Sequence, residues 1–313
     1  MALNSKKRSS DDLKFPEFED IKVSTKTFIA MTNLIIDLKK LFDYLPIIEY
    51  RVLPKKRGRK KKFEQIEERA FIESGSIVTL KFENDIRGVE LKKKKLDNKK
   101  KKSKWFRNSF TVVMIIDNKP INFKICQNGM IQVTGCKFDS QAEECVKYIW
   151  YYIKDRKEIY KFSRDDYLQI MFIPVMRNID FSIGFFVDRE KLARYMSSQT
   201  EFHSLLETSF GYTGVNIKVP ITSNIKDMEI TKMNFKDDKW VRSLTTYDEY
   251  LNRLSEKEIT KKINKDRFVT FLVFHSGKVI QSGINASLSR DSYYYFLKII
   301  RTAFDEIEER LDV

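Results

Sequence analysis

The stretch FKICQNGMIQVTG, residues 123–135, occurs a second time as FLVFHSGKVIQSG at residues 271–283. The two copies align without a gap at a constant offset of 148, so that Gly129 matches Gly277 and Gly135 matches Gly283. Each copy has the pattern of a strand, a tight turn at its first glycine and a second strand, and Asn128-Gly129 is a strong hairpin signal. A chain that carries this unit twice is expected to hold two copies of one small domain.

The positive charge of the chain is concentrated in one region. Its 313 residues have a formal net charge of +15. The segment from Arg51 to Lys104 holds 20 Lys and Arg against 8 Asp and Glu. A basic balance points to nucleic acid or to an anionic membrane surface. Here it points first to this segment, which contains the run VLPKKRGRKKK.

Several classes of function find no support in the sequence. Three cysteines (Cys126, Cys136 and Cys145) form no CxxC pair, and two histidines add no ligand set, so no metal or other cofactor is expected. No apolar run is long enough to cross a membrane, and the N-terminus lacks the apolar core of a secretory signal. No nucleophile, HExxH or phosphate-loop motif is present, so the chain is not expected to be an enzyme. We expect a soluble protein of a reducing, intracellular compartment.

The element pattern divides the chain into two similar halves. Residues 1–18 are polar and charged, which predicts a disordered tail. Residues 19–160 form a first repeat with a basic insertion at about 51–104, and residues 161–313 form a second repeat with an insertion at about 222–266. Each half is predicted to run strand, helix, three-stranded meander and long helix, which is an α+β fold. One helix, over residues 247–263, is expected in the second insertion.

The strand at residues 268–274 is apolar on both of its sides. Alternate residues of a strand face opposite ways, so Phe268, Thr270, Leu272 and Phe274 share one side and Val269, Phe271 and Val273 the other. Such a strand can lie in a sheet that is buried on both faces. It can also lie in a sheet that keeps one apolar face open for a partner. Because each half offers only two helices, which suffice for one face, the sequence favours an open face.

Two longer strings carry a family resemblance. FTVVMIIDNKPINFKICQNGMIQVTGCK, residues 110–137, resembles the first-repeat core of TATA-box-binding proteins. KDRFVTFLVFHSGKVIQSG, residues 265–283, followed by SYYYFLKIIRTAF, residues 292–304, resembles their second-repeat core and final helix. The insertions match nothing in that family. The resemblance implies a saddle in which two pseudo-symmetric repeats form one curved antiparallel sheet with helices on the convex face. The long insertions and the Lys- and Asn-rich composition look like the divergent members of large DNA viruses.

The resemblance also implies a function. Members of this family lay the concave sheet face in the minor groove of DNA and prise base steps apart with paired phenylalanines. The chain would then be a transcription initiation factor that binds AT-rich promoter DNA and recruits a TFIIB-like factor and the RNA polymerase machinery. It would act in the nucleus or a cytoplasmic viral factory, and could be packaged in the virion. The alternative is a protein-interaction version of the saddle, in which the apolar face or the stirrup loops bind a protein and DNA binding is weak. Separately, an apolar face that is not occupied by DNA could pair with itself. A third class, an accessory domain of a nucleic-acid-processing enzyme, rests only on the basic insertion.

Individual residues follow from the resemblance. The positions of the DNA-contacting side chains are Phe110, Phe210, Phe274 and Cys126 as wedges, Thr134 and Ser282 as groove-floor hydroxyls, Asn178 as a central asparagine, and Lys137 as a phosphate contact. A thiol at the fourth wedge position has less apolar area than a ring, so the second repeat is expected to be the better lever. Gln132 and Gln281 fall at valine positions of the family's groove face, which makes that face more polar. For each of these residues the ordinary role of a sheet or turn side chain stays open.

Two further sets are candidates for contacts outside the groove. The basic run is Lys55, Lys56, Arg57, Arg59, Lys60, Lys61 and Lys62. It is expected either to be a solvated loop or import-like patch, or to contact phosphates and release counterions. Glu207, beside the second-repeat stirrup loop, is the candidate contact for a TFIIB-like partner, with an ordinary surface acid as the alternative.

Overall fold

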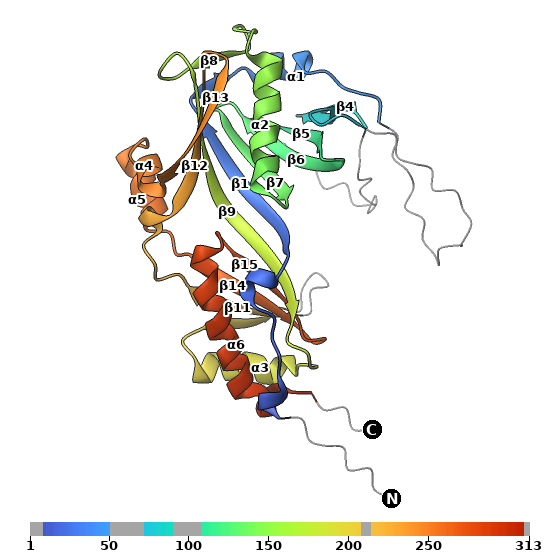
Figure 1. Cartoon of the computed structure of the whole chain (residues 1–313), viewed down its shortest axis with the longest axis vertical. Helices are drawn as coiled ribbons and strands as arrows, with labels where there is room; N and C mark the ends of the chain where they lie inside the picture. Colours follow the sequence, from blue (N-terminus) through green and yellow to red (C-terminus); the bar gives the residue numbers. More distant parts are fainter. Residues whose placement is uncertain (1–8, 51–71, 90–107, 208–213, 310–313) are drawn as a thin grey trace, which may run out of the picture. The chain divides into compact units, whose positions relative to one another are not determined.

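The structure is a computed structural model that describes residues 9–50, 72–89, 108–207 and 214–309. Its contacts divide the chain into two compact units, coloured along the sequence in Figure 1. The first-repeat unit comprises Thr27–Ile173 and Ile230–Thr245, and the second-repeat unit comprises Met1–Lys26, Pro174–Glu229 and Thr246–Val313. These contact-based units differ from the predicted repeats at two places. The N-terminal residues belong with the second repeat, and part of the second insertion belongs with the first.

The first-repeat unit is built on an antiparallel sheet. Its strands follow the order β1-β7-β6-β5-β3-β4. Their bounds are β1 Val23–Thr32, β3 Ile77–Phe82, β4 Asp85–Gly88, β5 Ser109–Ile116, β6 Lys119–Cys126 and β7 Met130–Cys136. Helix α1 (Leu38–Tyr44) follows a short strand, β2 (Leu34–Ile36), which pairs with β8 (Tyr160–Phe162). Helix α2 (Asp139–Ile153) follows β7, as the sequence predicts.

Alternation along the strands places the core of this unit on one face of the sheet. Phe123 and Ile125 of β6 are 1% and 0% exposed. They belong to the same apolar cluster as Cys145 and Ile149 of α2, the helix drawn across β6 and β7 in Figure 1. The α2 residues are spaced four apart and so share one helix face. This face of α2 therefore points into the core.

The second-repeat unit repeats this plan. Its strands follow the order β10-β11-β14-β15-β9, with bounds β9 Leu168–Ser182, β10 His203–Glu207, β11 Gly214–Pro220, β14 Phe268–Phe274 and β15 Lys278–Gly283. Helices α3 (Arg189–Gln199) and α6 (Ser287–Ile307) supply its core. The ring of Phe271 stacks on that of Phe296 of α6, with centroids 4.2 Å apart and planes at 8°. The α+β class, with two repeats that each combine an antiparallel sheet with helices, is confirmed.

Residues 9–18 are part of the fold, so the predicted disordered tail is wrong for them; residues 1–8 lie outside the described part. Two short 3-10 helices, η1 (Ser10–Asp12) and η2 (Phe18–Asp20), border a segment whose Leu13 and Phe18 are 2% and 3% exposed. Arg301 of α6 donates to the carbonyl oxygens of Ser10 and Leu13, each at 3.0 Å. This segment is ordered despite its polar composition, because the buried side chains of Leu13 and Phe18 pack in the same apolar cluster as α6.

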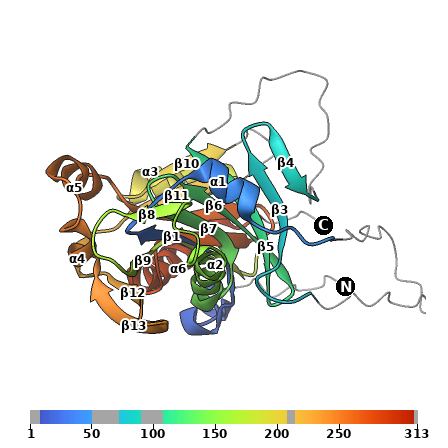
Figure 2. The same cartoon turned by 90° about the horizontal axis from the view of Figure 1, so that it is seen from above.

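The second insertion holds a hairpin that the sequence did not predict. Strands β12 (Glu229–Lys236) and β13 (Lys239–Thr246) precede two short helices, α4 (Tyr247–Leu251) and α5 (Glu256–Ile263), in place of the single predicted helix. Within the first-repeat unit β12 pairs with β9, and Figure 2 shows the hairpin on the same side as α2. The indole N–H of Trp240 donates to the Tyr151 hydroxyl of α2 at 2.7 Å. Arg242 forms an ion pair with Glu143, also of α2, at 3.2 Å.

Candidate nucleic-acid interface

The two repeats pair their strands in the same register. In the first repeat Asn122 lies opposite Thr134, and in the second Thr270 lies opposite Ser282, which are the positions 148 residues later. The adjoining strand agrees, because Ser109 lies opposite Cys126 and Gly214 lies opposite Phe274. The sequence match therefore extends to the hydrogen-bonded neighbours, and each residue of one sheet has a defined counterpart in the other.

Each sheet has one helix-covered face and one face left partly exposed, which we call the open face. In β14 the residues Val269, Phe271 and Val273 are fully buried, while the residues between them are half-buried. The open face of the second repeat includes Phe268, Thr270, Leu272, Phe274, Ile280, Ser282, Asn178 and Asn216, together with Leu205 and the charged residues Lys218 and Asp180. That of the first repeat comprises Thr111, Asn122, Lys124, Cys126, Gln132 and Thr134. The burial pattern confirms the expected uncovered face. Gln281 is not on it, because it is 1% exposed on the helix side.

The chemistry of the open faces differs between the repeats. Across the second sheet, Leu205, Asn216, Leu272 and Ile280 form one row of neighbours, and Leu205 is 64% exposed. The corresponding row of the first sheet is Lys81, Thr111, Lys124 and Gln132. Three aliphatic side chains in one repeat thus stand where the other has two lysines and an amide. Along these four positions the second repeat is the more apolar and the first the more polar and cationic, and the exposed Asp180 continues the row of the second repeat beside Ile280.

Part of the first-repeat open face is covered by the chain itself. Val113 and Ile115 of β5 point to this face, yet they are only 5% and 2% exposed. With Val78 they form a separate small cluster, against which Ile48, Tyr50 and Ile72 pack. The uncovered area of the first repeat is therefore limited to the region around Thr111, Lys124, Cys126 and Thr134.

Phe110 is not on the open face, and its predicted role as a wedge is wrong. It lies opposite Ile125 on the helix side of the sheet and is 1% exposed. The rings of Phe42 and Phe82 meet it edge to face at 6.3 and 6.2 Å. Successive strand residues face opposite ways, so an assignment shifted by one residue moves a side chain from DNA to the core. Its neighbour Ser109 is the residue that lies beside Cys126 on the open face.

Phe274 and Cys126 do occupy equivalent open-face positions. Both are half-buried, and burial raises the pKa of the Cys126 thiol above its usual range. Counting back four residues from their strand partners gives Phe210 in the second repeat and Trp105 in the first. Trp105 was not among the predicted residues, because insertions of different length separate it and Phe210 from the repeated hairpins and only the strand register relates the two positions. Phe210 and Trp105 both lie outside the described residues, as do the basic run Lys55–Lys62 and the side chain of Glu207.

Hydroxyl and amide groups gather on neighbouring strands of the second repeat. Ser282 lies between Thr270 of β14 and Asn178 of β9. The Asn178 Oδ1 atom is buried and has no hydrogen-bond partner among the described residues. In the first repeat the Thr134 hydroxyl donates to the Asn122 carbonyl oxygen at 3.0 Å. Lys137 is exposed where β7 leads into α2, and its backbone N–H donates to Gln141 Oε1 at 2.8 Å.

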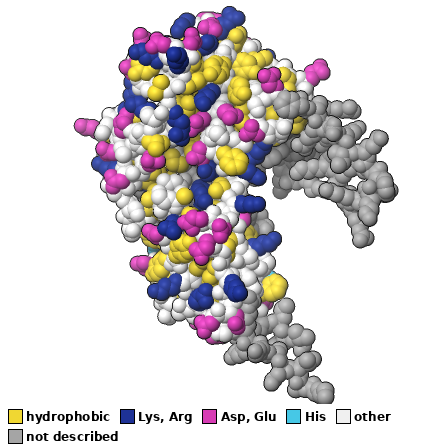
Figure 3. Space-filling model, viewed as in Figure 1, with side chains coloured by type: hydrophobic (Ala, Val, Ile, Leu, Met, Phe, Trp, Pro, Cys, Tyr) yellow, Lys and Arg dark blue, Asp and Glu magenta, His cyan; other side chains and the backbone are white. Residues whose placement is uncertain are grey.

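The surface that carries α2 and α6 bears charges of both signs. Figure 3 shows Lys and Arg side chains interspersed with Asp and Glu in the view that carries α2 and α6. Within the described ranges no group of His, Cys, Asp and Glu is arranged to hold a metal ion. No helix among these residues is long and apolar enough to cross a bilayer.

These features define an α+β scaffold with two equivalent open sheet faces. In sequence the chain is similar to an uncharacterized protein, 335L, of Invertebrate iridescent virus 6, with 30% identity over 217 residues. It is also similar to a protein of Acanthamoeba polyphaga mimivirus named TATA-box-binding protein-like, with 25% identity over 224 residues. These matches cover 66% and 67% of the chain, but only 64% and 52% of the two relatives. No family model matches the chain.

A solved structure of Methanococcus jannaschii TBP is similar at 13% identity, with a TM-score of 0.45, over 92% of this chain and 99% of that one. The resemblance to the TATA-box-binding protein family is confirmed by the mimivirus relative, with which two thirds of the chain aligns.

Proposed function

We propose that the chain is a transcription initiation factor that binds AT-rich double-stranded DNA in the minor groove through the open faces of its two repeats. One observation carries the proposal. The same strand register in both repeats leaves the same face of each sheet uncovered, and apolar and hydroxyl side chains occupy it. A sheet that only supported helices would gain nothing from half-exposed Phe274, Leu272 and Ile280.

The polar row of the second repeat suits the floor of an AT-rich minor groove. That floor presents only the A N3 and T O2 acceptors, whereas G·C pairs add the guanine amino group. Ser282 and Thr270 can donate to these acceptors. Rotating the Asn178 amide by 180° puts its NH₂ where the unpartnered Oδ1 now lies, which adds a donor. Thr134 is the equivalent residue in the first repeat, and its hydroxyl has to leave the Asn122 carbonyl oxygen before it can donate to a base.

The open faces are expected to act unequally on DNA. Phe274 is the candidate wedge, since an apolar side chain in the minor groove can unstack a base step and bend the duplex. Its counterpart Cys126 has no ring, and the nearby Lys81 and Lys124 favour phosphate contact over insertion. Lys137 and the basic run 55–62 would add phosphate contacts and a steep dependence of affinity on salt. Recruitment of a TFIIB-like factor, through Glu207, and of the polymerase machinery in a nucleus or viral factory belongs to the same proposal.

DNA bending tests this function, because wedge insertion bends the duplex and loop electrostatics do not. End-labelled AT-rich and GC-rich duplexes are titrated with the protein, and the change in fluorescence energy transfer is compared with an electrophoretic mobility shift. We expect the AT-rich duplex to bind more tightly and to bend. Phe274→Ala should weaken the affinity for the AT-rich duplex about tenfold or more, which corresponds to a loss of about 1.4 kcal/mol of binding free energy, and should reduce the bend. The matched variant Cys126→Ala should change affinity and bending less. Equal binding of both duplexes without bending would refute the minor-groove mechanism.

One observation favours a second candidate, a protein-interaction module with weak DNA binding. The cluster of Val78, Val113 and Ile115 under Ile48 and Tyr50 reduces the area that the first repeat can offer to a duplex. On this hypothesis the open face of the second repeat meets a protein or a second copy of the chain. Absence of binding to any duplex, together with a Phe274-dependent dimer in sedimentation velocity, would favour it.

A further inference from the structure

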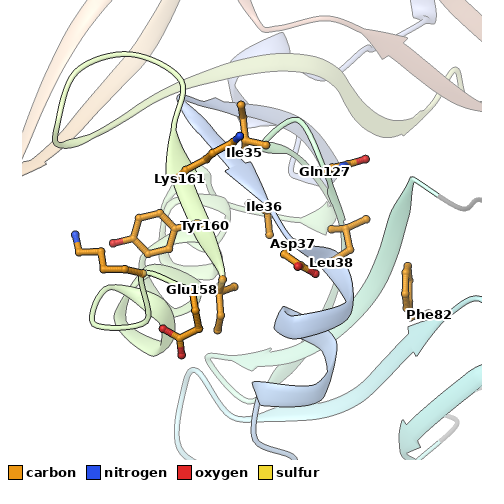
Figure 4. A pocket seen from close by; sticks show the side chains of 11 residues that line it. Ile35, Ile36, Asp37, Leu38, Phe82, Gln127, Glu158, Tyr160 and Lys161 are labelled. Carbon is orange, nitrogen blue, oxygen red and sulfur yellow. The ribbon is translucent and has the colours of Figure 1, made fainter.

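A pocket of about 580 Å³ lies in the first-repeat unit, away from the open face. It is bounded by the β2–β8 pair, the start of α1 and residues 157–159, with Phe82 of β3 on the opposite side (Figure 4). Its volume falls in the range of pockets that take a ligand or a large side chain. None of the residues assigned to DNA contact lines it.

The floor of the pocket is apolar. Ile36, Leu38, Ile159 and Tyr160 line it and are at most 7% exposed, and the rim residue Ile35 is 37% exposed. The Tyr160 hydroxyl donates to the Lys154 carbonyl oxygen at 2.8 Å, so the polar end of this ring is already satisfied. What the floor offers to an occupant is therefore hydrocarbon and aromatic surface, which favours an apolar side chain.

The rim carries charges of both signs, but only the positive ones are unpaired. Asp37 forms an ion pair with Lys40 at 3.6 Å, and Glu158 forms one with Arg156 at 3.9 Å. Lys157 and Lys161 are exposed, and within the described residues neither is in an ion pair. The Lys157 ammonium lies 5.4 Å from the centroid of the Tyr160 ring, directly beside the apolar floor. The charge that remains available to an occupant is positive.

We propose that this pocket docks an acidic peptide segment of a protein partner. A large apolar side chain of the segment enters between Phe82 and Tyr160, and flanking carboxylates pair with Lys157 and Lys161. The combination of an apolar floor with unpaired lysines selects for this chemistry, because neither a purely acidic nor a purely apolar segment uses both features. A nucleic-acid backbone satisfies the lysines but leaves the floor empty. The proposal does not depend on DNA binding by the open face.

Fluorescence anisotropy of a synthetic peptide tests the proposal with the full chain. The probe is a fluorescein-labelled peptide in which Asp alternates with Phe and Leu. Two control peptides replace either every Asp by Lys or every Phe and Leu by Ser. The test variants are Lys157→Glu with Lys161→Glu, and separately Ile35→Ser at the rim. Lys257→Glu with Lys261→Glu, two exposed lysines of α5, is the matched control for charge.

We expect the acidic apolar peptide to bind and both control peptides to bind at least about tenfold more weakly, since the loss of about 1.4 kcal/mol has that effect. Reversal at 157 and 161 should abolish binding, Ile35→Ser should weaken it, and reversal at 257 and 261 should leave it unchanged. Binding that survives the change at 157 and 161 overturns the proposal. So does equal binding of the peptide without apolar residues, which would mean attraction by charge alone. Loss of binding in Phe274→Ala would place the peptide on the open face and equally overturn it.

Discussion

Replacing Phe110 by alanine tests the pairing of β5 with β6, which places the Phe110 ring on the helix side of the sheet and not on the open face. Truncating a fully buried phenylalanine costs about 3–5 kcal/mol. Phe110 is 1% exposed, and both Phe42 and Phe82 would lose an edge-to-face partner. Each such pair contributes about 0.5–1.5 kcal/mol beyond its buried area. A loss no smaller than the middle of the 3–5 kcal/mol range is therefore expected, about 4 kcal/mol.

Urea unfolding followed by far-ultraviolet circular dichroism measures this loss. With an m-value of about 3 kcal/mol/M, a loss of about 4 kcal/mol lowers the unfolding midpoint of the first-repeat unit by about 1.3 M. Phe274→Ala is the control, because Phe274 is half-buried on the open face opposite a glycine. Its midpoint should change by no more than about 0.3 M, equivalent to about 1 kcal/mol.

Phe110→Ala should therefore affect mainly the stability of the fold, and Phe274→Ala should affect mainly the affinity for DNA. Phe110→Ala should unfold early and, when folded, retain the DNA affinity of the parent chain. The opposite outcome, an unchanged midpoint with lost DNA binding, would mean that the ring of Phe110 reaches DNA. The pairing of Ser109 with Cys126 would then be wrong, and with it the equivalence of the two open faces.

Three other changes test separate parts of the structure. Gly277 has φ +73°, and an added Cβ would lie 2.1 Å from the Phe185 carbonyl oxygen. Gly277→Ala should therefore destabilise the second-repeat unit by more than about 1 kcal/mol in scanning calorimetry, and a neutral effect would contradict this turn geometry. Because burial raises the pKa of Cys126, folding favours the neutral thiol. This contribution to stability is complete below the pKa of the thiol in the unfolded chain, and it is lost as the pH rises through the pKa of the thiol in the folded chain. The rate at which iodoacetamide alkylates Cys126 should therefore rise at a higher pH in the folded chain than in the urea-unfolded chain. Coincident curves of rate against pH would refute this prediction. Arg242→Ala leaves Glu143, with a side chain only 11% exposed, without its ion-pair partner. A loss of about 1–3 kcal/mol is expected in urea, and an unchanged midpoint would show that the β12–β13 hairpin is not held through this pair.

The repeated hairpin and its faces could be predicted because their signals are local. Period-two alternation and a glycine at each turn determine strand, turn and facing within a few residues, and both copies carry them. The side on which Phe110 lies could not be predicted in the same way. In FRNSFTVV either Ser109 or Phe110 can lead the strand, and only the partner across the sheet decides between them.

Contacts between segments that lie far apart in the chain could not be predicted from the sequence, for a different reason. Leu13 and Phe18 are isolated apolar residues in a polar stretch, so no periodicity marks them as core. Their burial depends on α6, about which the local sequence carries no information. The same holds for Trp240 and Arg242, whose partners Tyr151 and Glu143 lie on α2 of the first repeat. Candidate residues in the loops beyond the described ranges remain predictions.

The attachment of residues 9–18 to α6 has a consequence for how the chain acquires its fold during synthesis. The Tyr293 hydroxyl donates to the Pro16 carbonyl oxygen across 277 residues of sequence. On the ribosome this early segment has no partner until α6 (Ser287–Ile307) emerges, and Leu13 and Phe18 stay in water until then. Contacts this distant in sequence slow folding and prolong the exposure of apolar surface. The first-repeat unit likewise waits for β12 and β13. The second-repeat unit can therefore finish folding only after the first-repeat unit has been made, and the chain is expected to depend on holding chaperones until then.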